Sequence, residues 1–287
     1  MKFGFIGAGK VGFSIGKYFS RNNLDVVGYY SKSQESAKEA AEFTNSSYFN
    51  SIEELINKSD VIFITTPDRI IKEVWDNINK DIIKNKIICH CSGSLSSEIF
   101  SNIEDHKAYG YSIHPLFAIS DKYNSHKTLN EAFITIEGDT RYLEFFQELF
   151  LKLGNKVKII SKENKDKYHA AATIVSNQVI ALAKVGIDLL YSFGFSKEEA
   201  QEALYPLMLN NVQNIGKKGI INSLTGPVER GDVDTIKRHL NCLDKREDKE
   251  LYKLLSEKLI EIAKQKNNMD YSNIEKVIGE NDIWKIQ

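Results

Sequence analysis

Residues 2–12 read Lys2-Phe3-Gly4-Phe5-Ile6-Gly7-Ala8-Gly9-Lys10-Val11-Gly12. A short apolar run leads directly into three glycines spaced Gly-x-Gly-x-x-Gly, and residues 9–22 continue with the apolar spacing of a helix. In such a loop the first glycine permits a tight turn, the second lets the backbone approach a phosphate, and the third lets the helix pack closely on the strand. Since the glycines lie between a predicted strand and a predicted helix, they indicate a dinucleotide-binding loop formed by residues 7–12.

The same alternation of strand and helix continues along the first half of the chain. Helical patterns at residues 9–22 and 33–43 separate short, β-rich runs. The predicted strands are residues 2–6, 24–30, 61–65, 87–90, 108–113, 133–137 and 157–160. Alternation at this spacing predicts βαβ units and a mainly parallel sheet. We therefore expect an α/β fold whose first domain, residues 1–160, is a Rossmann domain.

The pattern changes after residue 160. Residues 161–191 have no strand signal, and alanines are dense from residue 169 onward, which is typical of a helix packed closely against other helices. Further helices are predicted after Ser196, a candidate N-cap, and at residues 232–240 and 249–263. We expect residues 161–287 to form an all-α second domain.

Composition excludes several classes of partner. The 38 basic and 39 acidic residues give a net charge of -1, so no sequence-wide field attracts nucleic acid or an anionic membrane. Three cysteines argue against a disulfide framework and for a reducing compartment. No secretory signal is evident, and no window approaches the roughly 20 apolar residues of a membrane span. We expect a cytoplasmic protein that binds neither nucleic acid nor membrane.

The residues after the second predicted strand bear on the choice of cofactor. NAD-preferring sites usually carry an acid there, whereas this chain has Ser31-Lys32-Ser33. A lysine and two hydroxyls suit the 2′-phosphate of NADP(H), which we therefore predict as the cofactor. Ser31 or Ser33 can also simply cap the next helix while Lys32 is solvated, and both interpretations can hold together.

Two more loops follow predicted parallel strands and are expected at the edge where the cofactor passes. Thr65, Thr66 and Pro67 follow one strand; Thr66 is also expected as an N-cap, with Pro67 as the first helical residue. Ser92, in a small and hydroxyl-rich loop, follows another strand and is expected beside the nicotinamide ring. The preceding Cys-His-Cys run has too few ligands for zinc, so we expect no metal.

His114 ends a further predicted strand. It either makes one ordinary hydrogen bond or contacts substrate or nicotinamide.

The chain resembles Rossmann-like proteins with a helical C-terminal domain of unknown function, which are relatives of pyrroline-5-carboxylate reductase, ketopantoate reductase and the 6-phosphogluconate dehydrogenase superfamily. The resemblance covers nearly the whole chain. It rests on the glycine motif and on residues 90–96, 112–116, 136–139, 169–172, 176–177, 224–232 and 239–240. It implies an NADP-dependent oxidoreductase that forms a homodimer through its C-terminal helices.

The resemblance also suggests a substrate. The chain is similar to alternative ketopantoate reductases of pantothenate biosynthesis, which makes 2-dehydropantoate the leading candidate. The imine of pyrroline-5-carboxylate, or another small 2-oxo acid, comes next.

Catalytic residues are implied less clearly. Orthodox relatives use a Lys-x-x-x-Asn pair; Asn177 fits the asparagine, but Thr173 occupies the lysine position. His169, two turns before Asn177, is the best replacement, because an imidazole exchanges protons near neutral pH. Lys165 and Lys167 are weaker candidates, since both are expected to face water. Alternatively, His169 is a helix-cap residue and Asn177 makes an interhelical hydrogen bond.

Residues 224–232 read Leu-Thr-Gly-Pro-Val-Glu-Arg-Gly-Asp, a density of special residues that a simple loop does not need. Arg230 is expected to grip a substrate carboxylate. Asp232 either restrains Arg230 or caps the next helix.

Two other classes of function stay open. The missing lysine also suits a non-catalytic NADP(H)-sensing regulator on a dehydrogenase scaffold. A purely structural helical dimer would leave the glycine loop unexplained.

Overall fold

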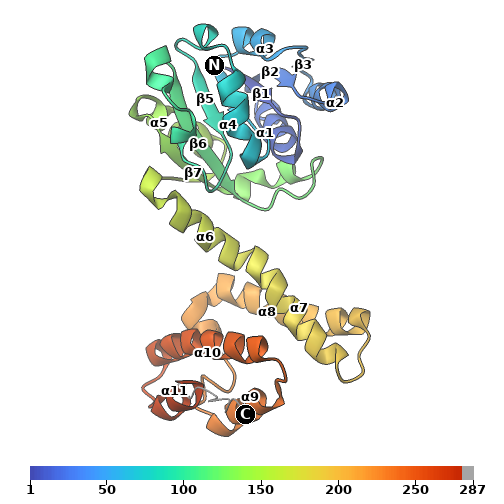
Figure 1. The fold of residues 1–287 in the computed structure, drawn as a ribbon, viewed down its shortest axis with the longest axis vertical. Coiled ribbons are helices and arrows are strands. Elements are labelled where there is room, and N and C mark those ends of the chain that lie inside the picture. The colour runs from blue at the N-terminus through green and yellow to red at the C-terminus, as the bar shows by residue number, and fades with distance from the viewer. Residues whose placement is uncertain (280–287) are drawn as a thin grey trace, which may run out of the picture. The chain divides into compact units, whose positions relative to one another are not determined.

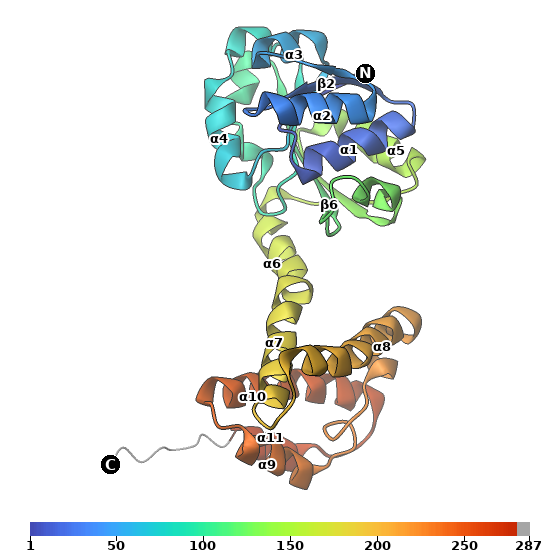
Figure 2. The same cartoon turned by 90° about the vertical axis from the view of Figure 1, so that its right-hand side faces the viewer.

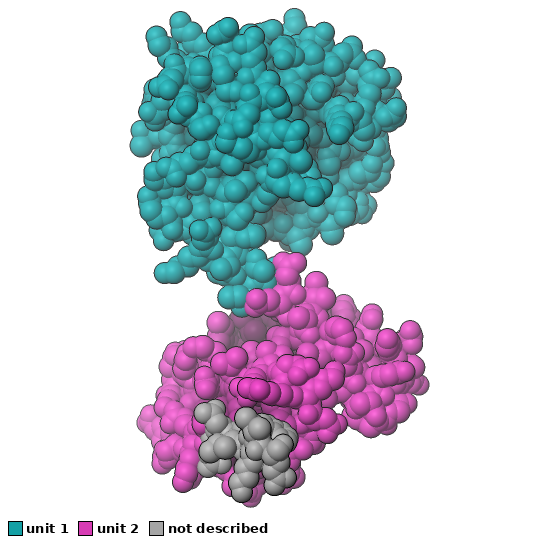
Figure 3. All heavy atoms as spheres, viewed as in Figure 1, with its two compact units in different colours: residues 1–176 teal, residues 177–287 magenta. Residues whose placement is uncertain are grey.

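The computed structural model describes residues 1–279. The chain divides into two compact units, residues 1–176 and residues 177–287 (Figure 3). The division falls after Ser176, so the first helix beyond residue 160 belongs to the unit that contains the sheet. A functional boundary at residue 160 stays a prediction.

The first unit is built on one mainly parallel sheet of order β3-β2-β1-β4-β5-β6-β7-β8 (Figure 1). Only the β6–β7 pair is antiparallel among the paired strands of the described chain. The strands are β1 (Lys2–Ile6), β2 (Asp25–Tyr30), β3 (Ser47–Tyr48), β4 (Val61–Ile64), β5 (Ile87–His90), β6 (Tyr109–Leu116), β7 (Phe133–Gly138) and β8 (Lys156–Ile159). The α/β prediction is confirmed.

Helices cover both faces of this sheet (Figure 2). One face carries α1 (Lys10–Arg21), α2 (Gln34–Thr44) and α5 (Leu143–Lys152), and the other carries α3 (Ile52–Lys58) and α4 (Asp68–Asn77). The whole of β4 is buried, as a central strand covered on both faces should be. Short 3-10 helices lie in the loops at Lys80–Ile82, Ser97–Ile99, Ile103–His106, Ser125–Lys127, Leu129–Glu131, Thr140–Tyr142 and Lys162–Asn164.

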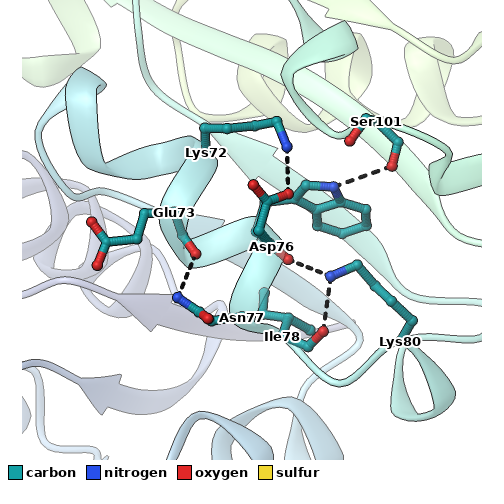
Figure 4. A network of polar contacts seen from close by, with 8 residues as sticks. Lys72, Glu73, Asp76, Asn77, Ile78, Lys80 and Ser101 are labelled. Atoms are coloured by element: carbon teal, nitrogen blue, oxygen red, sulfur yellow. Dashed lines mark hydrogen bonds and ion pairs between the residues drawn. The ribbon is translucent and has the colours of Figure 1, made fainter.

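A polar network fixes the carboxyl end of α4 (Figure 4). Trp75 is buried, packs edge-on against Phe100, and donates from Nε1 to the Ser101 carbonyl at 3.2 Å. Lys80 donates to the carbonyls of Trp75 and of Ile78, the latter at 2.8 Å. Because these bonds anchor one end of α4, they also fix its amino end at the carboxyl edge of the sheet.

The second unit contains α7 (Asn177–Tyr191), α8 (Lys197–Ser223), α9 (Val233–Cys242), α10 (Arg246–Lys266) and α11 (Ser272–Gly279). Ser196 caps α8 in a reciprocal capping box with Glu199, which confirms the predicted helix start. Gly219 has φ 77° and kinks α8. A small core packs beneath these helices; it consists of Leu224, Val228, Ile236, Ile260, Ala263, Tyr271, Ile274 and Ile278.

One helical stretch corrects an expectation from the sequence. Lys162–Tyr191 is long and apolar enough to cross a membrane by length and composition alone, with a mean hydropathy of 1.5 in its most apolar window. None of that window is buried inside the single chain. One such helix is weak evidence for a membrane, but its exposed apolar surface needs a physical explanation.

Candidate active site

The glycine loop has the geometry that a bound pyrophosphate requires. Gly7 has φ 109°, a conformation that L side chains rarely adopt, and its N–H donates to the Tyr30 carbonyl at 2.7 Å. A Cβ on Gly12 would lie 2.4 Å from the Gly7 carbonyl oxygen, so only glycine allows α1 to approach this closely. At Gly9 a Cβ would meet nothing within 4 Å, and α1 has no side-chain cap and no acid in its first turn. The backbone N–H groups at the start of α1 are therefore free to bind phosphate oxygens.

The loop after β4 supports the glycine turn. Thr65 is buried and donates from Oγ1 to the Gly7 carbonyl at 2.8 Å. The Thr66 hydroxyl is buried and has no hydrogen-bond partner within residues 1–279, so it suits a polar group of the cofactor. The predicted capping is wrong by one residue. Pro67 is the N-cap of α4, because its extended ψ of 146° delays the helix to Asp68.

The loop after β2 confirms one of the two interpretations made from the sequence. Ser33 caps α2 by accepting from the Ser36 N–H at 3.2 Å, and its hydroxyl donates to Glu35 at 2.9 Å. Lys32 is exposed and has no hydrogen bond or ion pair to another residue of the described chain, and Ser31 is half-buried. Roles for these three residues toward a 2′-phosphate stay predictions.

The structure corrects the interpretation of Lys165. Its side chain is 2% exposed, not solvated, and its Nζ donates to the Ser92 carbonyl at 3.0 Å and to Ser112 Oγ at 2.7 Å. Burial lowers the pKa of Lys165 to about 8, although the charges of Glu137, Asp68 and Cys91 raise it. Lys165 is the first residue of α6 (Lys165–Val175), and its two hydrogen bonds hold it at the sheet edge.

Two predicted histidines converge on the loop after β5. A Cβ on Gly93 would lie 2.6 Å from His169 Cδ2 and 3.0 Å from His114 Nε2, so both rings lie against this glycine. His114 Nδ1 is 2.7 Å from the Tyr168 hydroxyl. Burial, together with the charge of Lys165, lowers the pKa of His114 to about 4, so its ring is neutral at pH 7.

Ser92 is the centre of the hydrogen-bond network in this loop. Its hydroxyl donates to Asp68 at 2.6 Å and accepts the N–H of Leu95 at 3.0 Å. Its own N–H donates to His90 Nδ1 at 3.2 Å, and His90 Nε2 lies 3.1 Å from the Ser96 carbonyl. His90 is therefore fully occupied inside the protein, and burial lowers its pKa to about 4. No group of three or more metal-ligating side chains occurs in residues 1–279.

Asn177 and Arg230 belong to the second unit. Asn177 begins α7, and Arg230 is exposed, with no hydrogen bond or ion pair from its guanidinium group to any residue of the described chain. Asp232 caps α9 by accepting from the Thr235 N–H at 3.0 Å, which confirms that alternative. The Glu229 carboxylate forms an ion pair with Lys266 at 3.1 Å, so part of the motif at residues 224–232 is structural. The substrate roles of Asn177 and Arg230 stay predictions.

Sequence reasoning missed Tyr168 and Asp68, and it ranked Lys165 below His169. A usable signal was present for Lys165. Lys165 and His169 are spaced Lys-x-x-x-His, one helical turn apart on one face of α6. The search for a lysine four residues before Asn177 led instead to Thr173.

Comparisons with known proteins agree with this geometry. Residues 2–92 match the family described as NADP oxidoreductase coenzyme F420-dependent, and residues 132–259 match the domain of unknown function DUF2520. No curated protein sequence matches the chain.

Several solved structures share the fold. The Thermotoga maritima protein TM1727 is 29% identical, with a TM-score of 0.72, and the match covers 92% of this chain and 98% of that one. The 1-pyrroline-5-carboxylate reductase of Streptococcus pyogenes is 17% identical, with a TM-score of 0.62 and coverage of 92% and 98%. The Plasmodium falciparum pyrroline carboxylate reductase, solved with NADP bound, is 18% identical, with a TM-score of 0.59 and coverage of 93% and 98%.

The two family matches meet in the first unit. Asp68 and Ser92 come from the first matched segment, whereas Lys165, Tyr168 and His169 come from the second. The chain is thus an NADP-binding oxidoreductase in which residues 2–92 match the NADP oxidoreductase model and residues 132–259 match the DUF2520 model.

Proposed function

We propose that the protein is an NADPH-dependent reductase of a small C=N or C=O compound, that a pyrroline-5-carboxylate-type imine is its substrate, and that Lys165 donates the proton. The observation that carries this proposal is the buried Lys165 ammonium group at the carboxyl edge of the sheet. Ligands of open α/β sheets bind at that edge.

Lys165 has one donor to spare. An ammonium group has three N–H bonds, and two of them go to Ser92 and Ser112. The third is left for a substrate atom. With a pKa of about 8 the group is protonated at pH 7 yet gives up its proton readily, as a general acid should.

In this hypothesis, different residues bind the cofactor and the substrate. Residues 7–12, with Thr66 nearby, would hold the dinucleotide, which when bound supplies the hydride. The chain's part is to protonate the substrate nitrogen and to orient the substrate, for which His114, His169 and Tyr168 are the nearest side chains.

The imine alternative is favoured over 2-dehydropantoate. Two similar solved structures are pyrroline carboxylate reductases. The Asp68 carboxylate, fixed by the Ser92 hydroxyl at 2.6 Å, adds negative potential beside Lys165. Both candidate substrates carry one carboxylate, so the difference lies at the reacting group: negative potential stabilises a cationic iminium but not a neutral ketone.

The test replaces Lys165 by methionine. Because the proton donor is lost, we expect kcat for pyrroline-5-carboxylate to fall by about 10²–10⁴ while calorimetric NADPH binding is kept. In the wild type, the ammonium form is lost as the pH rises through about 8, so kcat should fall above that pH. Lys167→Met, two residues away and exposed, is the matched control. Unchanged turnover by the Lys165 variant would refute the assignment.

We also propose a cytoplasmic homodimer formed through α7 and α8. The apolar side chains of α8 lie among polar ones rather than on one buried face. Tyr205, Leu207 and Val212 are each more than 60% exposed, beside an apolar groove of about 510 Å³ between α7 and α8, and exposed apolar surface of this kind marks an interaction site. A second copy would cover this surface with an equally apolar one.

A further inference from the structure

Glu137 on β7 is a buried acid that the proposed reduction does not use. Its side chain is 5% exposed. Its two carboxylate oxygens accept from the Ser97 N–H and the Ser97 hydroxyl, each at 2.7 Å. These bonds fix the carboxylate but do not neutralise it. A buried charge of this kind is costly unless an opposite charge lies close to it.

The strand register places that opposite charge beside it. Glu137 lies directly opposite Ser112 in the antiparallel β6–β7 pair, so their side chains leave the same face of the sheet with Cβ atoms about 5 Å apart. Ser112 Oγ accepts from Lys165 Nζ at 2.7 Å. Glu137 and the Lys165 ammonium group are therefore both neighbours of the same serine.

Among residues 1–279, no other charge is placed so favourably for Lys165 as Glu137. The titratable groups that act on it or surround it are Asp68 of α4, His90 and Cys91 at the end of β5, His114 of β6, Glu137 of β7, and Tyr168 and His169 of α6. Burial keeps His90 and His114 neutral, and it raises the pKa of the Cys91 thiol to about 12. Of the two acids, Asp68 is exposed whereas Glu137 is buried and has the larger effect on Lys165.

We propose that Glu137 is a positioning residue for this site, whose buried carboxylate is the counter-charge that keeps Lys165 an ammonium ion and holds it against Ser112. This inference rests on the proposed function only in giving Lys165 a catalytic purpose. The effect of Glu137 on the titration of Lys165 can be measured without turnover.

The experiment titrates Lys165 directly. In the free protein, ¹⁵N NMR of the lysine side chains follows the Lys165 signal, which is assigned by its absence in Lys165→Met. We expect Glu137→Gln to lower the titration midpoint by about one pH unit. The pH above which kcat falls should move down by the same amount, because the acid form is lost earlier. If Glu137 had a purely structural role, Glu137→Gln would lower kcat without changing the pH above which kcat falls.

Two controls separate charge from hydrogen bonding. Ser97→Ala removes a bond to Glu137 but keeps the carboxylate, so the Lys165 midpoint should stay in place. Glu104→Gln removes an exposed acid and should also leave the midpoint unchanged. An unchanged midpoint in Glu137→Gln would overturn the inference while Lys165 could still be the donor. A shifted midpoint with full activity in Lys165→Met would overturn the proposed function instead.

A folding failure would also be informative. If Glu137→Gln does not fold because it leaves an ammonium ion without its counter-charge, Glu137→Gln combined with Lys165→Met should fold. If the double variant fails as well, the loss comes from the Ser97 bonds, and the counter-charge role is refuted.

Discussion

The two units of the chain treat polar and apolar side chains in opposite ways. In the first unit, a lysine, an acid and several hydroxyls are buried and hydrogen-bonded to one another around Ser92 and Ser112. In the second unit, large apolar side chains of α7 and α8 are exposed. The first unit satisfies its buried polar groups within one chain, whereas the second leaves an apolar surface that needs a partner. Chemistry is therefore expected to depend on the first unit, and association on the second.

In the first unit, the largest loss of activity is expected when a side chain fills the space at Gly93. Gly93→Ala places a Cβ 2.6 Å from His169 Cδ2 and 3.0 Å from His114 Nε2, so at least one ring must move. A misplacement of about 1 Å in an active site lowers kcat by about 10²-fold, and this is the loss that we expect in steady-state kinetics. NADPH binding, measured by calorimetry, should be retained because the glycine loop is untouched.

The matched control for Gly93 lies in the second unit. At Gly216 of α8 a Cβ would meet nothing within 4 Å. Gly216→Ala should leave kcat unchanged and stabilise the helix by up to about 1 kcal/mol. Equal kcat in the two alanine variants would show that His114 and His169 have no part in turnover.

The second unit is tested by placing a charge on its apolar surface. Leu207 is 61% exposed on α8. If a second copy covers it, Leu207→Glu costs roughly 2 kcal/mol and raises the dimer Kd about 30-fold, measured by sedimentation velocity. Residues 1–176 should keep their NADPH binding.

Leu254 supplies the control for this prediction, because it is 60% exposed on α10, outside the proposed surface. Leu254→Glu should leave the dimer intact. If both glutamates weaken association equally, the interface is not on α7 and α8; if the wild type is monomeric at all concentrations, the homodimer proposal is wrong.

The same contrast explains what could be predicted from the sequence. The glycine loop, the strand alternation and the caps at Ser33 and Ser196 depend on residues close together in the chain, so their patterns are visible there. The two-residue strand β3 is too short to produce such a pattern.

At the centre of the candidate site, the one local pattern was the spacing of Lys165 and His169, and that spacing does not reveal that the lysine is buried. Lys165 is buried by groups 73 and 53 residues away, the Ser92 carbonyl and the Ser112 hydroxyl. A lysine at the start of a helix looks solvated until the fold brings those groups to it. Glu137 likewise becomes a counter-charge only through the β6–β7 register.

The smallest expected effect concerns the choice between the two nicotinamide cofactors. Lys32 is exposed next to the end of β2 and has no charged partner among residues 1–279. If its ammonium group binds the 2′-phosphate, Lys32→Ala removes one charge-assisted hydrogen bond and raises the Kd for NADPH about tenfold. NADH, which lacks that phosphate, should bind as tightly as before. Lys58→Ala, an exposed lysine on α3, should change neither affinity. Equal losses for both cofactors in Lys32→Ala would instead mean that the lysine supports the loop as a whole, and the 2′-phosphate would need another ligand.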